Sequence, residues 1–217
     1  MPKSEVYKKM DSVISCVSPL LRELKYKKRG HTYNRTIQPG LIHVINFQMG
    51  KYEGENYQEI PPYRVNLYGK FTINIGVYIE EVHNLLCKWK VTNFISEPDC
   101  EIRKRIGELI DKGHDLWWDL NYEESVIGTD IKVKIEKFII PFLARFSSTD
   151  QIIREWEIHG NGIGFPPRGR LSIAILFFYR GDKNIARDLI MQEYNENITK
   201  PYASFVMGVA EQLDIEL

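Results

Sequence analysis

The feature that most constrains the fold is an alternation of apolar and polar residues in two segments, 41–49 and 71–79. In the second segment one face carries Phe71, Ile73, Ile75, Val77 and Ile79, and the other carries Thr72, Asn74, Gly76 and Tyr78. Successive side chains of a β-strand point to opposite faces, so a period of two residues predicts a strand. One apolar face and one polar face are typical of an antiparallel sheet with a core on one side and at least partial solvent exposure on the other.

Segments on both sides of these strands have the three- and four-residue spacing of amphipathic helices. An apolar stripe runs through residues 6–24, and we expect a kink or a helix restart at Pro19, which has no N–H to donate. A second stripe runs from Ile131 to Phe146, and we expect its helix to begin at Thr129 or Asp130 and to bend at Pro141.

The segment Cys100–Ile110 is compatible with both a strand and a helix, and the pattern favours a strand. The predicted fold is therefore α+β, with an antiparallel β-sheet packed against an N-terminal helix and a C-terminal helical part. We expect a single domain over residues 1–217, in which 1–125 form the helix and sheet and 126–217 form the helical part.

The charge balance and the length of the apolar runs limit the partners. The chain has 29 Lys and Arg and 29 Asp and Glu, so no global field attracts nucleic acid or an anionic membrane. No apolar run approaches the roughly 20 residues that a bilayer span requires. We expect a cytoplasmic protein without a membrane partner, and the sequence gives no indication of its oligomeric state.

Sequence motifs for catalysis and for metal binding are absent. The three cysteines are widely spaced, without a CxxC pair or a Cys/His cluster at ligand spacing. The glycines of the segment 159–164 lack the preceding strand and following helix of a phosphate-binding loop. We therefore predict no catalytic residue, no metal ligand and no cofactor.

Five segments carry a family resemblance, in the order "LKYKKRGHTYNR", "GLIHVINFQ", "FTINIGVYI", "CEIRKRIGEL" and "DLWWDL". With them the chain resembles the bacterial domain of unknown function 4304 family over roughly its first 120 residues. The resemblance implies a sheet packed with helices in a small cytosolic protein. It implies no reaction.

Two surfaces are candidates for binding a ligand or a partner. The polar strand face presents Asn46, Gln48, Asn74 and Tyr78, and amides inside strands need a reason to be there. They either bind a ligand or hold a loop or helix by hydrogen bonds. Trp117 and Trp118 are a partner anchor if one of them is exposed, and core residues if both are buried.

A basic turn is the third candidate. It contains Lys25, Lys27, Lys28 and Arg29, with Arg35 nearby, and could contact phosphate groups. One short patch lacks the domain-wide basic surface of a nucleic-acid-binding protein, so a solvated turn is the favoured interpretation.

Our leading functional hypothesis is a non-catalytic module that binds another macromolecule, such as an inhibitor or immunity-type protein that binds a protein partner. The first alternative is an enzyme of unknown class with its site on the polar sheet face. The second alternative is nucleic-acid binding through the basic turn between Lys25 and Arg35.

Overall fold

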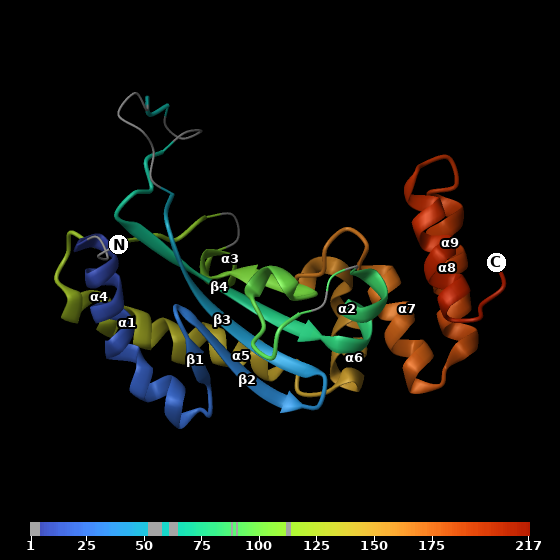
Figure 1. Ribbon diagram of the computed structural model, residues 1–217, viewed down its shortest axis with the longest axis horizontal. Helices are drawn as coiled ribbons and strands as arrows, with labels where there is room; N and C mark the ends of the chain where they lie inside the picture. Colours follow the sequence, from blue (N-terminus) through green and yellow to red (C-terminus); the bar gives the residue numbers. More distant parts are fainter. Residues whose placement is uncertain (1–4, 52–57, 61–64, 88, 90, 112–113) are drawn as a thin grey trace. The chain divides into compact units, whose positions relative to one another are not determined.

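The computed structural model describes residues 5–51, 58–60, 65–87, 89, 91–111 and 114–217. It has the predicted α+β fold, with an N-terminal helix, an antiparallel sheet and a C-terminal helical part (Figure 1). The elements up to the last strand are α1 (Glu5–Glu23), β1 (Lys27–Arg29), β2 (Thr32–Gln38), β3 (Leu41–Met49), β4 (Lys70–Ile79), α2 (Glu80–Leu86), the 3-10 helix η1 (Glu97–Asp99), β5 (Ile102–Arg105), α3 (Ile106–Ile110) and β6 (Trp118–Asp119). The later elements are α4 (Glu124–Lys134), the π-helical turn η2 (Ile135–Ile139), α5 (Ile140–Ala144), α6 (Thr149–His159), the 3-10 helix η3 (Gly160–Ile163), α7 (Gly169–Arg180), α8 (Lys183–Glu196) and α9 (Tyr202–Gln212).

Among the described residues the sheet has the strand order β1-β2-β3-β4-β5, and β6 pairs with β4 outside this order. Strand β1 runs antiparallel to β2, with Arg29 opposite Thr32, and β6 runs antiparallel to β4, with Trp118 opposite Phe71. Every residue of the segment 71–79 is buried. The expectation of a partly wet polar face was therefore wrong for β4, because this strand lies inside the sheet order and is covered on both faces.

Contacts between Cα atoms divide the chain into two compact units. Unit 1 contains Met1–Arg35, Val44–Ile75 and Lys104–Phe142, and unit 2 contains Thr36–His43, Gly76–Arg103 and Leu143–Leu217. The strands of the sheet contribute residues to both units. Each unit is described by itself below.

In unit 1, α1 packs against α4, and the two helices run side by side in Figure 1. The buried stripe of α1 is Met10, Val13, Ile14, Val17 and Leu21. The helix continues through Pro19, so the predicted restart does not occur. Burial of the stripe on both sides of the proline compensates for the one backbone hydrogen bond that proline cannot make.

Helix α4 begins at Glu124, one turn or more before the predicted cap at Thr129 or Asp130. Gly128 lies in the part of α4 before the predicted cap, and a Cβ at this position would lie 2.7 Å from the Cβ of Cys16 in α1. This close approach joins segments that are distant in sequence. At the predicted bend near Pro141 the chain forms the π-helical turn η2. The N–H of Ile140, the residue before the proline, donates to the carbonyl of Ile135.

The ambiguous segment Cys100–Ile110 contains both types of structure, because β5 ends at Arg105 and α3 begins at Ile106. The favoured strand was therefore right only for residues 102–105. Gly107 lies in the helical half, where a Cβ would be 2.1 Å from the carbonyl oxygen of His114. A glycine is required at this position by the close approach of the backbone.

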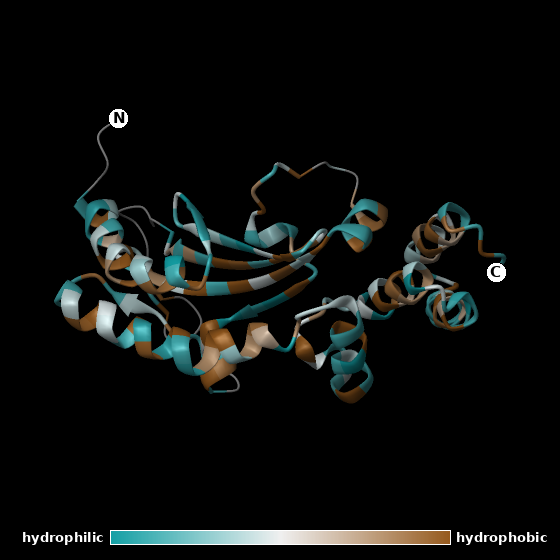
Figure 2. Ribbon diagram, turned by 90° about the horizontal axis from the view of Figure 1, so that it is seen from below, coloured by the Kyte–Doolittle hydropathy of each residue, from teal (hydrophilic) through white to brown (hydrophobic). Residues whose placement is uncertain are grey.

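In unit 2, α7 is the central helix and packs against α2, α6 and α8. Its residues 171–177 are all buried, as expected for a short apolar helix. Helices α8 and α9 bury one face each, and the helices nearest the C-terminus carry both hydrophilic and hydrophobic residues in Figure 2. Among the described residues no helix has the length and apolar character needed to cross a membrane.

Candidate functional site

The strand amides that the sequence singled out are tied to neighbouring side chains in unit 1. The Asn46 side chain donates to the Thr32 hydroxyl over 2.8 Å, and the Asn74 side chain donates to Gln48 over 2.6 Å. The Asn74 oxygen in turn accepts a bond of 3.2 Å from Arg105 Nε. These bonds between strands account for the amides structurally, and a ligand at this face stays a prediction.

The two tryptophans have different environments within unit 1. Trp118 is buried, stacks on Phe71 with ring centroids 5.5 Å apart, and donates to Asp130 over 2.8 Å. It is a core residue. Trp117 is half-buried, and its indole N–H donates to Asp115 over 2.8 Å.

The predicted basic turn is a turn only at Lys25, because Lys27, Lys28 and Arg29 form the strand β1 and Arg35 lies in β2. Lys25 has a positive φ of 66°, and β1 is exposed along its length. Lys28 lies over the ring of Tyr33, 5.7 Å from its centroid, and Arg35 lies 6.0 Å from the ring centroid of Tyr26.

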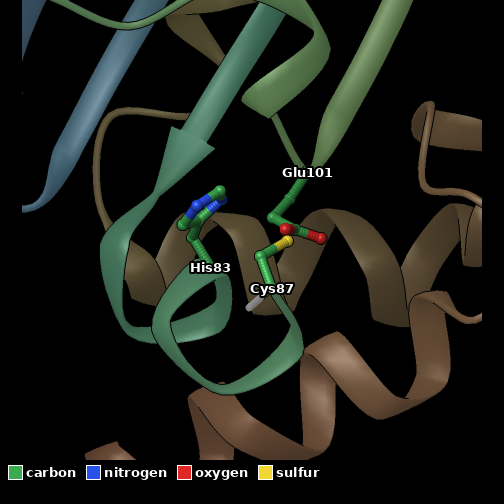
Figure 3. Close-up of side chains that lie close together, drawn as sticks. All are labelled: His83, Cys87 and Glu101. Carbon is green, nitrogen blue, oxygen red and sulfur yellow. The ribbon is translucent and has the colours of Figure 1, made fainter. Parts of the chain in front are cut away.

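Tyr78, the fourth residue of the predicted polar face, is buried in unit 2. Its ring lies 5.2 Å from the ring of His83, which belongs to a cluster that the sequence analysis did not single out. Possible metal-ligand atoms of His83, Cys87 and Glu101 all lie within 4.8 Å of one another, and Figure 3 shows the three side chains converging. We call these three residues the His–Cys–Glu cluster.

Three short segments bring the cluster together. His83 lies in α2 and Cys87 is the residue that caps it, so a four-residue step places both on one face of the helix. Glu101 precedes β5, and its N–H donates to the carbonyl of Val77 over 3.0 Å. This bond to β4 fixes the position of the Glu101 backbone beside the helix that follows β4.

The hydrogen bond of His83 determines which ring nitrogen is available. The Nε2 atom lies 3.3 Å from the carbonyl oxygen of Trp89, which can only accept a hydrogen bond. In a neutral ring this bond places the proton on Nε2 and leaves the lone pair on Nδ1. Nδ1 is buried and has no hydrogen-bond partner among the described residues. A carbonyl that orients the ring in this way is a common arrangement in metal-binding histidines.

The other two members are held in surroundings that favour their protonated forms. Glu101 is buried and accepts a bond of 3.4 Å from the Ser172 hydroxyl. Burial raises the pKa of Glu101, and Arg168 and His83 oppose the shift. Burial also raises the pKa of the Cys87 thiol, and the Glu101 carboxylate adds to the rise.

A cavity of about 250 Å³ adjoins the cluster within unit 2. Cys87 and Glu101 form part of its wall, together with Arg103, Phe165 and Arg168. The cavity therefore gives two of the three clustered side chains access to a small ligand or to water.

The sequence did not predict the cluster, because its only local pattern is one histidine followed four residues later by one cysteine. One histidine and one cysteine do not make a metal site by themselves, so this spacing is not a metal-binding pattern on its own. Glu101 comes fourteen positions after Cys87 and is brought back by its pairing with β4, which no local pattern reports.

The family model described as "Domain of unknown function (DUF4304)" matches residues 17–145, and this range contains the whole cluster. No curated protein matches the chain. No solved structure matches it either. Since the family match spans more than half of the chain, from α1 to the residue after α5, the protein belongs to the DUF4304 family.

Proposed function

We propose that the protein is a binding module that holds a divalent transition-metal ion, best fitted by Zn²⁺, between His83, Cys87 and Glu101. The observation that carries the proposal is the convergence of three different ligand atoms within 4.8 Å. Imidazole nitrogen, thiolate sulfur and carboxylate oxygen are the three side-chain ligands that zinc uses in proteins.

The distances support one ion shared by all three residues. Ligand atoms bound to one tetrahedral Zn²⁺ at about 2.0–2.3 Å lie roughly 3–4 Å from one another. The upper limit of 4.8 Å in the cluster is slightly larger, so binding requires an inward shift of the ligand atoms. The unpaired Nδ1 of His83 supplies a buried lone pair that otherwise has no partner among the described residues.

A bound metal ion would also favour the ionised forms of the Cys87 thiol and the Glu101 carboxyl group. A thiol and a carboxyl group in a buried setting resist ionisation, but a bound divalent cation deprotonates a coordinating thiol. Binding therefore releases protons, and metal affinity should fall as the pH is lowered. The expected class remains a non-catalytic binding module, and its macromolecular partner stays a prediction.

The test is a titration of chelator-treated protein with Zn²⁺ against a chromophoric competitor, together with Co²⁺ absorption spectra. We expect one ion per chain and a thiolate-to-cobalt charge-transfer band in the near ultraviolet. Cys87→Ser should abolish the band and lower Zn²⁺ affinity by more than the roughly 10- to 100-fold that loss of a ligand's hydrogen-bond partner costs. His83→Gln should lower the affinity by a similar factor.

The control is Cys16→Ser, which removes an exposed thiol from α1 in unit 1. This variant should keep the affinity and the cobalt band of the unmodified protein. Stoichiometry well below one ion per chain, or an equal loss in Cys16→Ser and Cys87→Ser, would contradict the proposal.

A second candidate function is metal-dependent hydrolysis, and the number of ligands favours it. Catalytic zinc sites have three protein ligands and an open position for water, whereas structural sites have four. The cavity beside Cys87 and Glu101 could hold that water. Turnover of a panel of activated ester and phosphoester substrates that requires Zn²⁺ and is lost in His83→Gln would establish this alternative, and its absence would leave the binding role.

A further inference from the structure

A second cavity, of about 580 Å³, lies in unit 1 between the C-terminal half of α1 and the strands β1 and β2. Three cationic side chains line it, those of Arg22, Lys27 and Lys28. The volume falls within the range of about 300–1,000 Å³ that is usual for small-molecule sites. We call it the α1–β1 pocket.

The three cations of the α1–β1 pocket have no carboxylate partner among the described residues, although the chain as a whole has equal numbers of acidic and basic side chains. Elsewhere in unit 1 comparable cations are paired, such as Lys104 with Glu108 and Arg105 with Asp115. Three unpaired cations around one hollow repel one another, and a bound anion would remove this repulsion.

Hydroxyl groups complete the lining. Ser18 and Tyr33 share a hydrogen bond of 2.7 Å, which fixes both oxygens at the wall. Tyr26 also lines the pocket, and its hydroxyl is buried beside the Arg35 side chain. Burial raises the pKa of Tyr26 and of Tyr33, so both phenols keep their protons. The Ser18 hydroxyl donates to the Ile14 carbonyl over 2.9 Å, so Tyr33 is the donor in its bond to Ser18, and Tyr26 is the phenol that can donate to a ligand.

The free carbonyl groups at the C-terminus of α1 repel an anion in the pocket only weakly. A helix C-terminus carries partial negative charge on its free carbonyl groups. Here three of these carbonyls accept hydrogen bonds from the N–H groups of Leu24, Lys25 and Tyr26. The local field in the α1–β1 pocket is then dominated by the guanidinium and the two ammonium groups.

We propose that the α1–β1 pocket binds a phosphate group carried by a small molecule. Phosphate oxygens accept several charge-assisted hydrogen bonds at once, and a guanidinium with flanking ammonium and hydroxyl groups offers them. The tyrosine rings of the wall provide an apolar surface for the organic part of the ligand. The same phosphate chemistry is present in a free phosphomonoester and at the end of an oligonucleotide, so the experiment compares these sources.

Isothermal titration calorimetry of the full chain should use pyrophosphate, adenosine monophosphate and a single-stranded oligonucleotide as separate probes at low salt. We expect saturable one-to-one binding of the first two, which weakens as NaCl is raised. Arg22→Gln and Lys28→Gln should each weaken binding by about 10-fold, the value for loss of one charge-assisted hydrogen bond.

Arg29→Gln is the matched control, because Arg29 lies on the same strand as Lys27 and Lys28 but does not line the cavity. Its effect should stay below about 2-fold, as for an exposed charge at a distance. Circular dichroism of each variant verifies that it is folded. Absence of saturable binding, or an equal loss in Arg29→Gln and Lys28→Gln, would overturn the proposal. Oligonucleotide binding that pyrophosphate does not displace would also overturn it, in favour of nucleic-acid binding along the exposed strand.

Discussion

Gly76→Ala should destabilise unit 2, because the side chain of Cys100 occupies the space that a methyl group would need. A Cβ at Gly76 would lie 2.4 Å from the Sγ atom and 2.7 Å from the Cβ atom of Cys100. Favourable contacts between non-bonded heavy atoms occur at about 3.5–4.0 Å, so both atoms have to move by roughly 1 Å. Cys100 is buried, and its thiol donates to the Ser96 carbonyl over 3.7 Å.

Overpacking of this kind costs typically about 1–3 kcal/mol, and two short contacts on a central strand place the expected cost near 2 kcal/mol. Removal of the sulfur should recover part of this cost. Cys100→Ala alone loses the burial of one small group, about 1 kcal/mol. In the double variant Gly76→Ala/Cys100→Ala, the total loss should be about 1 kcal/mol smaller than the sum, since residues in contact couple by about 0.5–3 kcal/mol.

Urea unfolding monitored by circular dichroism and tryptophan fluorescence measures the free energy of unfolding of the four proteins in this cycle. Gly208→Ala is the control for a simple glycine-to-alanine change, because a Cβ there meets nothing within 4 Å in α9. It should be neutral or stabilising by up to about 1 kcal/mol. A Gly76→Ala protein as stable as the unmodified one, or strictly additive effects in the cycle, would refute the reasoning.

Further predictions concern ion pairs and pH. Glu97 is buried and accepts two hydrogen bonds from Arg103, of 2.7 and 3.1 Å, so Glu97→Gln should cost about 1–2 kcal/mol in urea unfolding, between the values for exposed and buried pairs. Burial alone would raise the pKa of Asp130, but hydrogen bonds from Lys134 and Trp118 lower it below the usual value. Asp130 therefore stabilises the fold above the unfolded-state pKa of about 3.9, and this contribution is lost as the pH falls through the lower folded-state pKa. The free energy of unfolding of Asp130→Asn, measured by urea unfolding at several pH values, should depend less on pH in that window. A pH dependence equal to that of the unmodified protein would show that these hydrogen bonds contribute nothing.

The strands were predictable from sequence because a period of two residues is a local property. The alternation in 71–79 identified β4 without reference to any other segment. The burial of its polar face was not predictable in the same way. Thr72 and Tyr78 carry polar groups and look solvent-facing in sequence, yet they are buried by elements that come from elsewhere in the chain.

The helix boundaries show the same limit. Pro19 and the predicted cap at Thr129 or Asp130 were interpreted from local backbone preferences, which contribute about 1–3 kcal/mol each. Helix α1, which packs against α4, has five fully buried side chains, each worth about 1.5–3 kcal/mol. The free energy gained by burying these side chains exceeds the local backbone preferences and therefore sets the ends of these helices.

The proposed metal site combines ligands from the family-matched segment with surroundings supplied by later residues. His83, Cys87 and Glu101 all lie within residues 17–145, but Ser172, which donates to Glu101, lies in α7. Helix α7 packs directly against α2, the helix that carries His83. Without α7, Glu101 would lose its hydroxyl donor and α2 its apolar partner, so water would reach the cluster from this side as well as from the cavity. Unpaired polar groups are far costlier in a dry site than in a wet one, and a dry site also strengthens the attraction between a cation and its ligands. If the proposed site binds an ion, α7 thus contributes to the strength with which three ligands of the DUF4304 segment hold it.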